Sequence, residues 1–291
     1  MIAIDWGTTS LRAYRLAGRD ILDRRATPDG ITKIAPGAFP DTLRTLVADW
    51  LADGETHILM AGMVGSRQGW VEAPYLPCPA DPAALAAALT PVPFDGATVA
   101  IVPGLTHRDA HCVPEVMRGE ETQLAGAGAE DALFCLPGTH SKWATVANGA
   151  VTGFTTAMTG EAFAALRHHT ILGRLMVDAA SPGPADDAAF LEGVRRAGTE
   201  GGLLHHLFGV RTLGLFGELT EAAAPAYLSG HLNGAEIAAI AQTSPVRLIG
   251  APALCRLYAL ALADRGLDTR TEPPDLAATG LALIAEHNRW T

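Results

Sequence analysis

The feature that most constrains the fold is a pattern that occurs twice: an apolar strand, a loop of small residues, and a second strand. The first copy spans residues 1–4, 7–10 and 11–16, and the second begins with residues 132–136 and the loop 138–142. Two strands joined by a tight turn rich in glycine and threonine predict a β-hairpin. Helical patterns follow each copy. This repeated order of elements predicts two α/β domains of related architecture.

The remaining elements are predicted from the spacing of apolar residues. The expected helices are residues 41–51, 116–126, 159–172, 188–206, 226–242, 251–264 and 277–287. The further expected strands are residues 57–60, 98–102, 143–146, 151–155 and 246–249. We divide the chain into an N-terminal domain, residues 1–107, and a C-terminal domain, residues 108–291, with the last helix free to pack back on the first domain. Because small-molecule sites are common between domains, we expect a ligand cleft there.

Composition excludes several classes of function. The chain of 291 residues is 48% hydrophobic, which is enough for substantial cores. Its formal net charge of −10 leaves no basic surface for a nucleic-acid partner, and it contains no apolar run long enough to cross a membrane. The four cysteines are far apart and Asp5 interrupts the first apolar residues, so we expect a reduced, cytoplasmic protein without a signal peptide. The composition is compatible with a homo-oligomer and does not predict one.

The loop after the first strand has the composition of a phosphate-binding turn. Gly7 allows a phosphate to approach the backbone closely. Thr8, Thr9 and Ser10 add hydroxyl donors. Asp5 ends the strand, where a carboxylate can hold Mg²⁺ directly or through water. The same residues would also suit an ordinary hairpin turn capped by Asp5, and their spacing alone does not separate the two interpretations.

The loop of the second copy has similar chemistry. Gly138, Thr139 and Ser141 offer close backbone approach and hydroxyl donors. His140 can donate a hydrogen bond to a phosphate, and Lys142 supplies a positive charge. An ordinary β-turn followed by a surface lysine is the alternative interpretation.

The sequence as a whole resembles the 2-dehydro-3-deoxygalactonokinase family of the actin-like ATPase superfamily. Seven stretches in the right order carry the resemblance over nearly the whole chain: residues 4–12, 61–70, 116–123, 136–143, 158–161, 227–230 and 248–250. The resemblance implies two actin-like ATPase (ribonuclease H-like) domains with a nucleotide cleft between them. It also implies that the chain uses ATP and Mg²⁺ to phosphorylate the 6-hydroxyl of 2-dehydro-3-deoxy-D-galactonate, a step of galactonate catabolism.

By the same resemblance, the two loops are the phosphate-1 and phosphate-2 motifs, and Gly250 belongs to the adenosine motif. Two departures from the superfamily pattern stand out. Many members begin the second loop with an aspartate that helps to hold the metal, whereas Leu136 and Pro137 precede the glycine here. The metal would therefore depend on Asp5. The usual second glycine of the adenosine motif is Ala251 in this chain.

A kinase of this kind needs a carboxylate to orient and deprotonate the attacking hydroxyl. The adjacent Glu120 and Glu121 are the natural source, although two acidic residues at a helix start would also stabilise the helix dipole. Residues 119–124 look like a stretch of the exopolyphosphatases in which the second glutamate acts on water. That likeness favours Glu121, with Glu120 as the second choice. Glu161 is a further candidate for binding substrate hydroxyls.

A sugar acid also carries a carboxylate, for which arginine is the favoured partner because its planar fork meets both oxygens. Gly62 and Met63 offer backbone amides, Ser66 a hydroxyl and Arg67 a guanidinium within one short loop. Arg118 is the second arginine candidate, because it lies beside the glutamate pair. A surface arginine on a flexible loop is the plain alternative for Arg67.

Two other functions compete with the kinase. A phosphohydrolase like the exopolyphosphatases would use the same loops with water as the nucleophile, but a polyphosphate enzyme would favour a basic channel and this chain is acidic. A non-catalytic ATP- or sugar-binding regulator could share the fold. The presence of Asp5, Glu121 and Lys142 argues against that second alternative.

Overall fold

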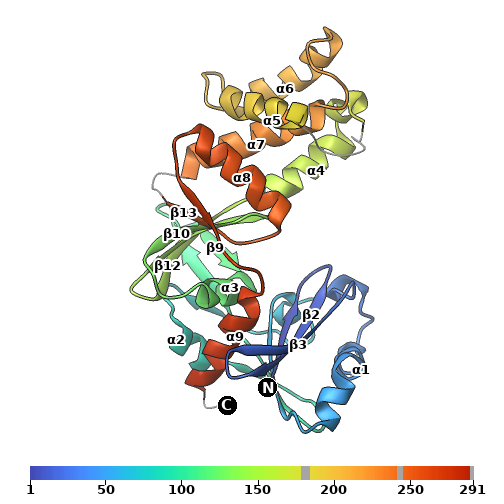
Figure 1. Ribbon diagram of the computed structural model, residues 1–291, viewed down its shortest axis with the longest axis vertical. Helices are drawn as coiled ribbons and strands as arrows, with labels where there is room; N and C mark the ends of the chain where they lie inside the picture. Colours follow the sequence, from blue (N-terminus) through green and yellow to red (C-terminus); the bar gives the residue numbers. More distant parts are fainter. Residues whose placement is uncertain (178–183, 241–244, 289–291) are drawn as a thin grey trace. The chain divides into compact units, whose positions relative to one another are not determined.

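The computed structural model describes residues 1–177, 184–240 and 245–288, and the chain divides into two compact units (Figure 1). Unit 1 consists of Met1–Ala132, Ala144–Phe154 and Pro273–Thr291. Unit 2 consists of Leu133–Trp143 and Thr155–Glu272.

Unit 1 is built on a six-stranded sheet with the order β3-β2-β1-β4-β7-β6. Its strands are β1 (Ile2–Trp6), β2 (Leu11–Ala17), β3 (Asp20–Thr27), β4 (His57–Ala61), β6 (Thr90–Val92) and β7 (Thr98–Ile101). Antiparallel pairing of β1 with β2 confirms the predicted N-terminal hairpin. Because β4 pairs in parallel with β1, the segments that follow these two strands leave the sheet at the same edge.

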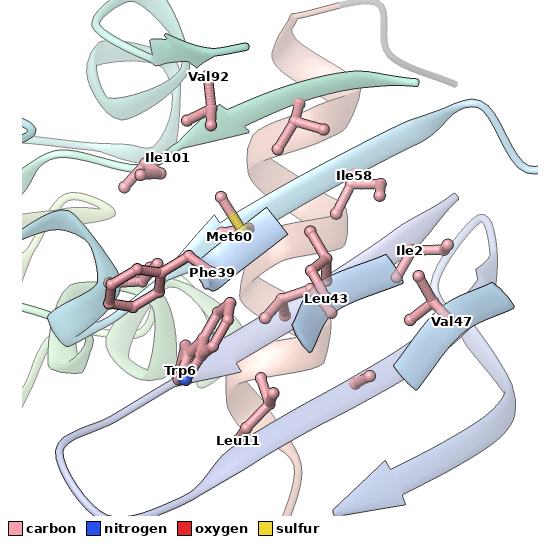
Figure 2. Close-up of a cluster of buried hydrophobic side chains, with 14 of the residues drawn as sticks. Ile2, Trp6, Leu11, Phe39, Leu43, Val47, Ile58, Met60, Val92 and Ile101 are labelled. Atoms are coloured by element: carbon pink, nitrogen blue, oxygen red, sulfur yellow. The ribbon is translucent and has the colours of Figure 1, made fainter. Parts of the chain in front are cut away.

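Apolar side chains between this sheet and α1 (Phe39–Ala52) form the core of unit 1 (Figure 2). Ile2 and Trp6 lie on the same face of β1, because side chains alternate along a strand. They pack in one cluster with Leu43 and Val47, which are one helical turn apart on α1. The rings of Trp6 and Phe39 are 5.3 Å apart. Each fully buried side chain of this size contributes roughly 1.5–3 kcal/mol, so the chain that enters the first loop at Trp6 is firmly anchored.

The other helices of unit 1 are α2 (Pro82–Ala87), α3 (Glu120–Gly126) and α9 (Leu276–His287). Helices α3 and α9 pack backbone to backbone: a Cβ atom on Gly126 would lie 2.1 Å from the Leu276 carbonyl oxygen, and one on Gly280 would lie 1.8 Å from that of Thr122. Helix α9 also contacts β1 and β4. The start of α3 is therefore held in place relative to the ends of these two strands.

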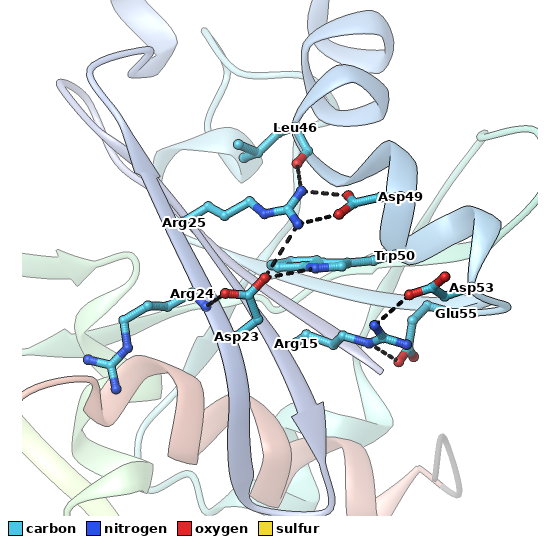
Figure 3. A network of polar contacts seen from close by, with 9 residues as sticks. All are labelled: Arg15, Asp23, Arg24, Arg25, Leu46, Asp49, Trp50, Asp53 and Glu55. Carbon is cyan, nitrogen blue, oxygen red and sulfur yellow. Dashed lines mark hydrogen bonds and ion pairs between the residues drawn. The ribbon is translucent and has the colours of Figure 1, made fainter.

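Ion pairs connect β3 to α1 on the surface of unit 1 (Figure 3). Arg25 binds both carboxylate oxygens of Asp49, at 2.7 and 2.6 Å, and its guanidinium lies 4.0 Å from the ring centre of Trp50. The hydrogen bonds from Arg25 hold the pKa of Asp49 down at about 2. Exposed pairs of this kind contribute at most about 1 kcal/mol, so Asp49 is a suitable control position for charge changes elsewhere in unit 1.

A second, five-stranded sheet has the order β12-β11-β10-β13-β14. Its strands are β10 (Ala132–Leu136), β11 (Ser141–Ala147), β12 (Ala150–Ala157), β13 (Val246–Leu248) and β14 (Thr269–Thr271). The helices of unit 2 are α4 (Thr159–His169), α5 (Pro184–Ala197), α6 (Gly202–Leu215), α7 (Ala224–Ile240) and α8 (Pro252–Asp264). Strands β10 and β13 are parallel, so the loops after them also leave the sheet at a common edge. Across the described ranges, no helix is long and apolar enough to cross a bilayer.

Two predicted helices differ from those observed. The helix expected over residues 116–126 begins only at Glu120, because residues 114–117 form β9 (Pro114–Met117) and Gly119 has a φ of 106° that ends the extended segment. The helix expected over residues 188–206 is two helices, α5 and α6. Gly201, which precedes α6, and Gly202, its first residue, have φ values of 122° and 75°, which lie outside the helical region. Of the helix expected over residues 226–242, the last two residues lie outside the described ranges.

The compact units divide the chain at a different place from the predicted boundary near residue 107. That residue lies within β8 (Gly104–Arg108), which pairs with β9 and with β5 (Tyr75–Pro77) in a small sheet of unit 1. Unit 1 continues through α3 to Ala132, and α9 at the end of the chain also belongs to it. The predicted boundary would cut the pairing of β8 with β9, in which His107 lies opposite Glu115, and the packing of α9 on α3 joins the end of the chain to unit 1.

Candidate active site

The predicted phosphate-1 loop, residues 7–10, packs against the segment that follows β3. The Gly7 amide donates to the Ser10 carbonyl oxygen at 2.9 Å, which closes the turn. The Thr32 hydroxyl donates to the Thr8 carbonyl oxygen at 2.9 Å. A Cβ atom on Gly30 would lie 2.2 Å from that same oxygen, so only glycine fits there. Both loop threonines are exposed, which leaves their side chains accessible to a ligand.

Three backbone segments converge beside Asp5. Gly62, at the end of β4, has a φ of 95°, and a Cβ atom on it would lie 2.7 Å from the Trp6 carbonyl oxygen and 3.5 Å from Asp5 Oδ1. A Cβ atom on Gly119 would in turn lie 3.2 Å from the Gly62 Cα atom. The structure therefore brings the first loop, the start of the acid-binding loop (residues 62–67) and the start of α3 to one place, as the parallel pairing of β1 and β4 requires.

Asp5 is a partly buried carboxylate with charged neighbours of both signs. Burial raises the pKa of Asp5, the positive charge of Arg12 lowers it, and the negative charge of Glu120 raises it. The Arg12 guanidinium is 3.4 Å from Asp5 Oδ2. A carboxylate at the end of this strand is suited to hold a cation directly or through water. In the part of the chain that the structure describes, no group of three or more histidine, cysteine, aspartate or glutamate residues is placed to hold a metal.

Glu120 and Glu121 have different environments although they are neighbours. Glu121 is buried, and both of its oxygens accept a hydrogen bond from the Gly119 amide, at 2.8 and 2.7 Å. Its side chain lines a cavity of about 300 Å³ together with residues of α2 and α9, among them Leu85 and Leu283. Glu120 is only half-buried, and its charge affects Asp5. Glu120 Oε2 accepts a hydrogen bond from the Arg118 amide at 3.0 Å, and Glu120 is the more exposed of the two glutamates.

Burial, with a further contribution from Glu120, raises the pKa of Glu121 from 4.5 to about 8. A folded-state pKa above the unfolded value means that the folded protein holds the proton more tightly. This contribution to stability is complete below pH 4.5 and is lost as the pH rises toward 8. We therefore expect the unfolding free energy of the wild type, relative to Glu121→Gln, to fall by on the order of a few kcal/mol between pH 5 and 8. Denaturant titrations of both proteins would measure it, and a difference that does not change with pH would contradict the burial of an ionisable group there.

The loop predicted to bind the sugar acid, residues 62–67, presents an accessible arginine. The Arg67 side chain is 84% exposed and forms an ion pair with Glu72, with Nε and Oε1 3.7 Å apart. That contact is long and exposed, so it restrains the guanidinium weakly. Met63, by contrast, packs against the apolar core of unit 1, which leaves its backbone rather than its side chain available for a ligand.

Arg118 is buried, and its side chain contacts other residues of unit 1. Its guanidinium lies 4.3 Å from the Tyr75 ring centre and donates to the Ala73 carbonyl oxygen at 2.7 Å. Its Nε and Nη1 atoms, and the hydroxyl of the buried Ser66, have no hydrogen-bond partner within the described ranges. These atoms are enclosed, so in this conformation neither Arg118 nor Ser66 presents its polar group to solvent.

The phosphate-2 loop, residues 138–142, packs against the start of α4. A Cβ atom on Gly160 would lie 2.5 Å from the Gly138 carbonyl oxygen, and the Glu161 amide donates to the Thr139 carbonyl oxygen at 3.0 Å. His140 Nε2 and Glu161 Oε2 are 2.5 Å apart, and both side chains are about half exposed. Glu161 therefore belongs with this loop in unit 2, and the other predicted substrate ligands belong to unit 1.

The last two residues of the loop turn inward. The Ser141 hydroxyl is fully buried and lies 2.7 Å from the Tyr258 hydroxyl. Lys142 is 5% exposed, with its Nζ atom 3.5 Å from the His140 carbonyl oxygen. The exposed polar groups of this loop are thus those of Thr139 and His140, and phosphate binding by Ser141 and Lys142 stays a prediction.

A largely apolar cavity of about 430 Å³ adjoins the phosphate-2 loop within unit 2. Its lining includes Gly138 from the loop, Phe163 from α4, and Ala253 and Leu254 from the first turn of α8. Gly250 lies where β13 leads into α8, and a Cβ atom on it would be 3.4 Å from the Pro137 carbonyl oxygen. The predicted adenosine motif and the phosphate-2 loop are therefore neighbours, with an apolar cavity of a size suited to a purine beside them.

Sequence reasoning missed the residues that support these loops. Gly30 and Thr32 hold the first loop, and Tyr258 and Glu236 lie behind the second. The sequence signal for Gly30 was its residue type alone. That signal is not specific, because glycine occurs in loops for many reasons. Glu236 gave no signal at all, since its partners are distant in sequence.

The mixed α/β fold is shared with a solved structure that contains a nucleotide analogue. The structure of the activator of 2-hydroxyisocaproyl-CoA dehydratase from Clostridium difficile, which contains ADPNP, superposes with a TM-score of 0.51 over 99% of this chain and 96% of its own, at 12% sequence identity. At that identity the match shows a shared fold and no more.

The chain belongs to the 2-keto-3-deoxy-galactonokinase family, whose sequence model matches residues 5–284. It is 41% identical to the probable 2-dehydro-3-deoxygalactonokinase DgoK1 of Rhizobium meliloti (strain 1021), over 97% of this chain and 95% of the relative. It is 36% identical to the 2-dehydro-3-deoxygalactonokinase of Escherichia coli (strain K12), over 98% and 97%. The solved structure of a candidate 2-dehydro-3-deoxygalactonokinase from Sinorhizobium meliloti superposes with a TM-score of 0.89 at 38% identity, over 98% of both chains.

Proposed function

We propose that this chain is a 2-dehydro-3-deoxygalactonokinase, which transfers the γ-phosphoryl group of ATP to the 6-hydroxyl of 2-dehydro-3-deoxy-D-galactonate. The observation that carries the proposal is the convergence of Asp5, Gly62 and the start of α3, in a chain that matches members of this kinase family along its length. The product would be the 6-phosphate of the sugar acid, an intermediate of galactonate catabolism.

Each unit contributes a different part of the reaction. Unit 2 offers the apolar cavity for adenine and the exposed backbone and side chains of the phosphate-2 loop. Unit 1 offers the phosphate-1 loop and the carboxylates. Closely placed backbone amides and hydroxyls neutralise phosphate charge without needing a basic surface, which is consistent with a chain whose net charge is −10.

Glu120 is the better candidate for the base. The substrate oxygen forms a bond to the γ-phosphorus while the bond from that phosphorus to the β,γ-bridging oxygen breaks, and the hydroxyl proton passes to a carboxylate. Glu121 is buried and holds its own proton near neutral pH, because burial raises its pKa to about 8. Its bonds to the Gly119 amide instead fix the turn from which Glu120 projects. The sequence likeness favoured Glu121, and the environments of the two side chains favour Glu120.

Asp5 is the residue suited to hold a divalent cation, and Glu120 is then free to accept the proton. Burial raises the pKa of Asp5 and the negative charge of Glu120 raises it further, a cost that a bound cation relieves. Mg²⁺, when bound, would neutralise phosphate charge and withdraw electrons from the phosphoryl group. With few protein carboxylates available, most of its ligands would be water and phosphate oxygens, as is usual for this ion.

Arg67 is the group suited to the carboxylate of the sugar acid. Its weakly paired, exposed guanidinium follows Gly62 by five residues, and Gly62 contacts Asp5. Arg118 is enclosed and serves to hold the loop that carries Arg67. This arrangement would select acids over neutral sugars of the same length.

Replacement of Arg67 by methionine is expected to raise KM for the sugar acid by roughly 10–100-fold, because a charge-assisted bidentate contact is lost. The kcat and the KM for ATP should change little. Steady-state kinetics with each substrate varied would measure this. Arg19→Met is the matched control, since Arg19 is an exposed arginine of unit 1 that pairs with Glu286 on the surface. Equal kinetic effects from both substitutions would remove Arg67 from the substrate site.

A coupled assay of ADP release distinguishes the kinase from its two rivals. The protein is incubated with ATP and Mg²⁺, with and without 2-dehydro-3-deoxy-D-galactonate. We expect ADP only when the sugar acid is present. Equal ADP release in its absence would indicate a phosphohydrolase, and no release under either condition would favour a non-catalytic binding protein.

A further inference from the structure

A buried carboxylate lies behind the phosphate-2 loop and takes no part in the reaction described above. Glu236, on α7, is 6% exposed. Its Oε1 atom accepts a hydrogen bond from Trp143 Nε1 at 2.6 Å, and its Oε2 atom accepts one from the Tyr258 hydroxyl at 2.7 Å. The Thr159 hydroxyl also donates to Oε2. One side chain thus collects three donors from β11, α8 and α4.

A fourth residue joins this network through Tyr258. The Ser141 and Tyr258 hydroxyls are 2.7 Å apart, and both are buried. Because Tyr258 gives its single proton to the Glu236 carboxylate, Ser141 must be the donor in this pair. Glu236, as a carboxylate, can only accept hydrogen bonds. It therefore sets the donor and the acceptor both in its own bond with Tyr258 and in the bond between Tyr258 and Ser141.

The network holds the chain on both sides of Lys142. Ser141 precedes this lysine and is anchored through Tyr258, and Trp143 follows it and is anchored directly. A strand residue between two fixed neighbours has little freedom in its backbone. Glu236 thereby determines where the end of the phosphate-2 loop lies.

The same network reaches the apolar cavity of unit 2. Thr159 and Tyr258, two of the donors to Glu236, both line that cavity. Thr159 also starts α4, whose next residue, Gly160, contacts the backbone of Gly138 and Thr139. The positions of the cavity wall and of the loop are therefore coupled through one carboxylate.

Packing alone does not explain a carboxylate at this position. Burial raises the pKa of Glu236, whereas the donors from Thr159, Trp143 and Tyr258 lower it. A buried carboxylate is costly unless its hydrogen bonds are satisfied, and an apolar residue of similar size often stabilises a fold better. The carboxylate instead holds Trp143, Tyr258 and Thr159, which lie on three different elements, in one fixed arrangement.

We propose that Glu236 is a positioning residue for ATP, which fixes the phosphate-2 loop and the adjoining cavity wall in the form that binds the nucleotide. The proposal rests on the proposed kinase function for its ligand. Glu236 would not touch ATP itself, because its oxygens are occupied by Trp143, Tyr258 and Thr159.

The test is nucleotide binding by Glu236→Gln. This substitution keeps the size of the side chain, but its amide NH₂ group can only donate and so cannot accept the hydrogen bonds that the second carboxylate oxygen accepts. Isothermal titration with a non-hydrolysable ATP analogue should show affinity reduced about tenfold or more, from the loss of hydrogen bonds to a charged group. The KM for ATP should rise in parallel, and the KM for the sugar acid should not change. Tyr258→Phe, which removes the connection to Ser141 and leaves the Trp143 bond, should give a smaller effect in the same direction.

Glu272→Gln is the matched control. Glu272 is an equally buried glutamate of unit 2, paired with Arg247 at 2.7 Å on β13. Its substitution should lower thermal stability at least as much as Glu236→Gln and leave nucleotide affinity unchanged. Equal nucleotide affinity in Glu236→Gln and the wild type would overturn the proposal, as would an equal loss of affinity in Glu272→Gln. If the wild type itself bound no ATP analogue, the proposed kinase function would fail first.

Discussion

Replacement of Glu120 by glutamine is expected to lower kcat by roughly 10²–10⁴-fold, the usual contribution of a general base. Affinity for ATP should stay nearly unchanged, because Glu120 lies in unit 1 and the cavity proposed for adenine lies in unit 2. Glutamine has the same size but does not accept the proton of the 6-hydroxyl. Pre-steady-state measurement of ADP formation would separate this chemical step from product release.

Glu121→Gln is the matched control for that experiment, one residue along the same helix. Glutamine can still accept the hydrogen bond from the Gly119 amide that Glu121 accepts at 2.7 Å, so we expect kcat to fall by less than about tenfold. A reversed pattern, with the larger loss in Glu121→Gln, would assign the base to Glu121. It would also show that the buried side chain is released when substrates bind.

Replacement of Asp5 by asparagine is the second substitution with a large expected effect. We expect kcat to fall by roughly 10²–10³-fold, the cost of removing one preorganised charged group from a reacting centre. Asparagine retains an oxygen but loses the negative charge that would hold the cation. The Mg²⁺ concentration that gives half-maximal activity should therefore rise. Titration of activity with Mg²⁺ in both proteins would measure that shift.

Asp49→Asn is the matched control for Asp5, because it also removes one arginine-paired carboxylate from unit 1. Asp49 lies on α1 in the surface network with Arg25 (Figure 3). Its substitution should change neither kcat nor the response to Mg²⁺. An Asp5→Asn protein with normal kcat and a normal Mg²⁺ titration would exclude Asp5 from the metal site.

The parts of the fold that depend on local sequence were predictable. The hairpin of β1 and β2 joins strands separated by a short glycine-containing loop, and alternation of apolar residues specified both strands. The break between α5 and α6 lies in residues 198–201, where the prediction of one continuous helix gave too little weight to the glycines at positions 198, 201 and 202. The membership of α9 in unit 1 depends on contacts with elements more than 150 residues earlier, which no local pattern encodes.

For the candidate site, residue types in the sequence singled out Asp5 and two glycine-containing loops, and the structure brings Asp5 together with Gly62 and Gly119. Sequence likeness ranked Glu121 above Glu120, but it carried no information on burial, because adjacent residues of a helix differ in burial only through what surrounds the helix. It also could not show that the Ser141 hydroxyl points into the core toward Tyr258, since that contact joins residues 117 apart.

The most direct test of the central claim is a ³¹P NMR measurement of the reaction products. The purified chain is incubated with ATP, Mg²⁺ and 2-dehydro-3-deoxy-D-galactonate, and the phosphorus signals are followed over time. We expect one equivalent of a phosphate monoester for each ADP formed, with its phosphorus signal coupled to the C6 protons and with little inorganic phosphate. Inorganic phosphate accumulating in step with ADP, or a phosphate on any other oxygen of the sugar acid, would contradict it.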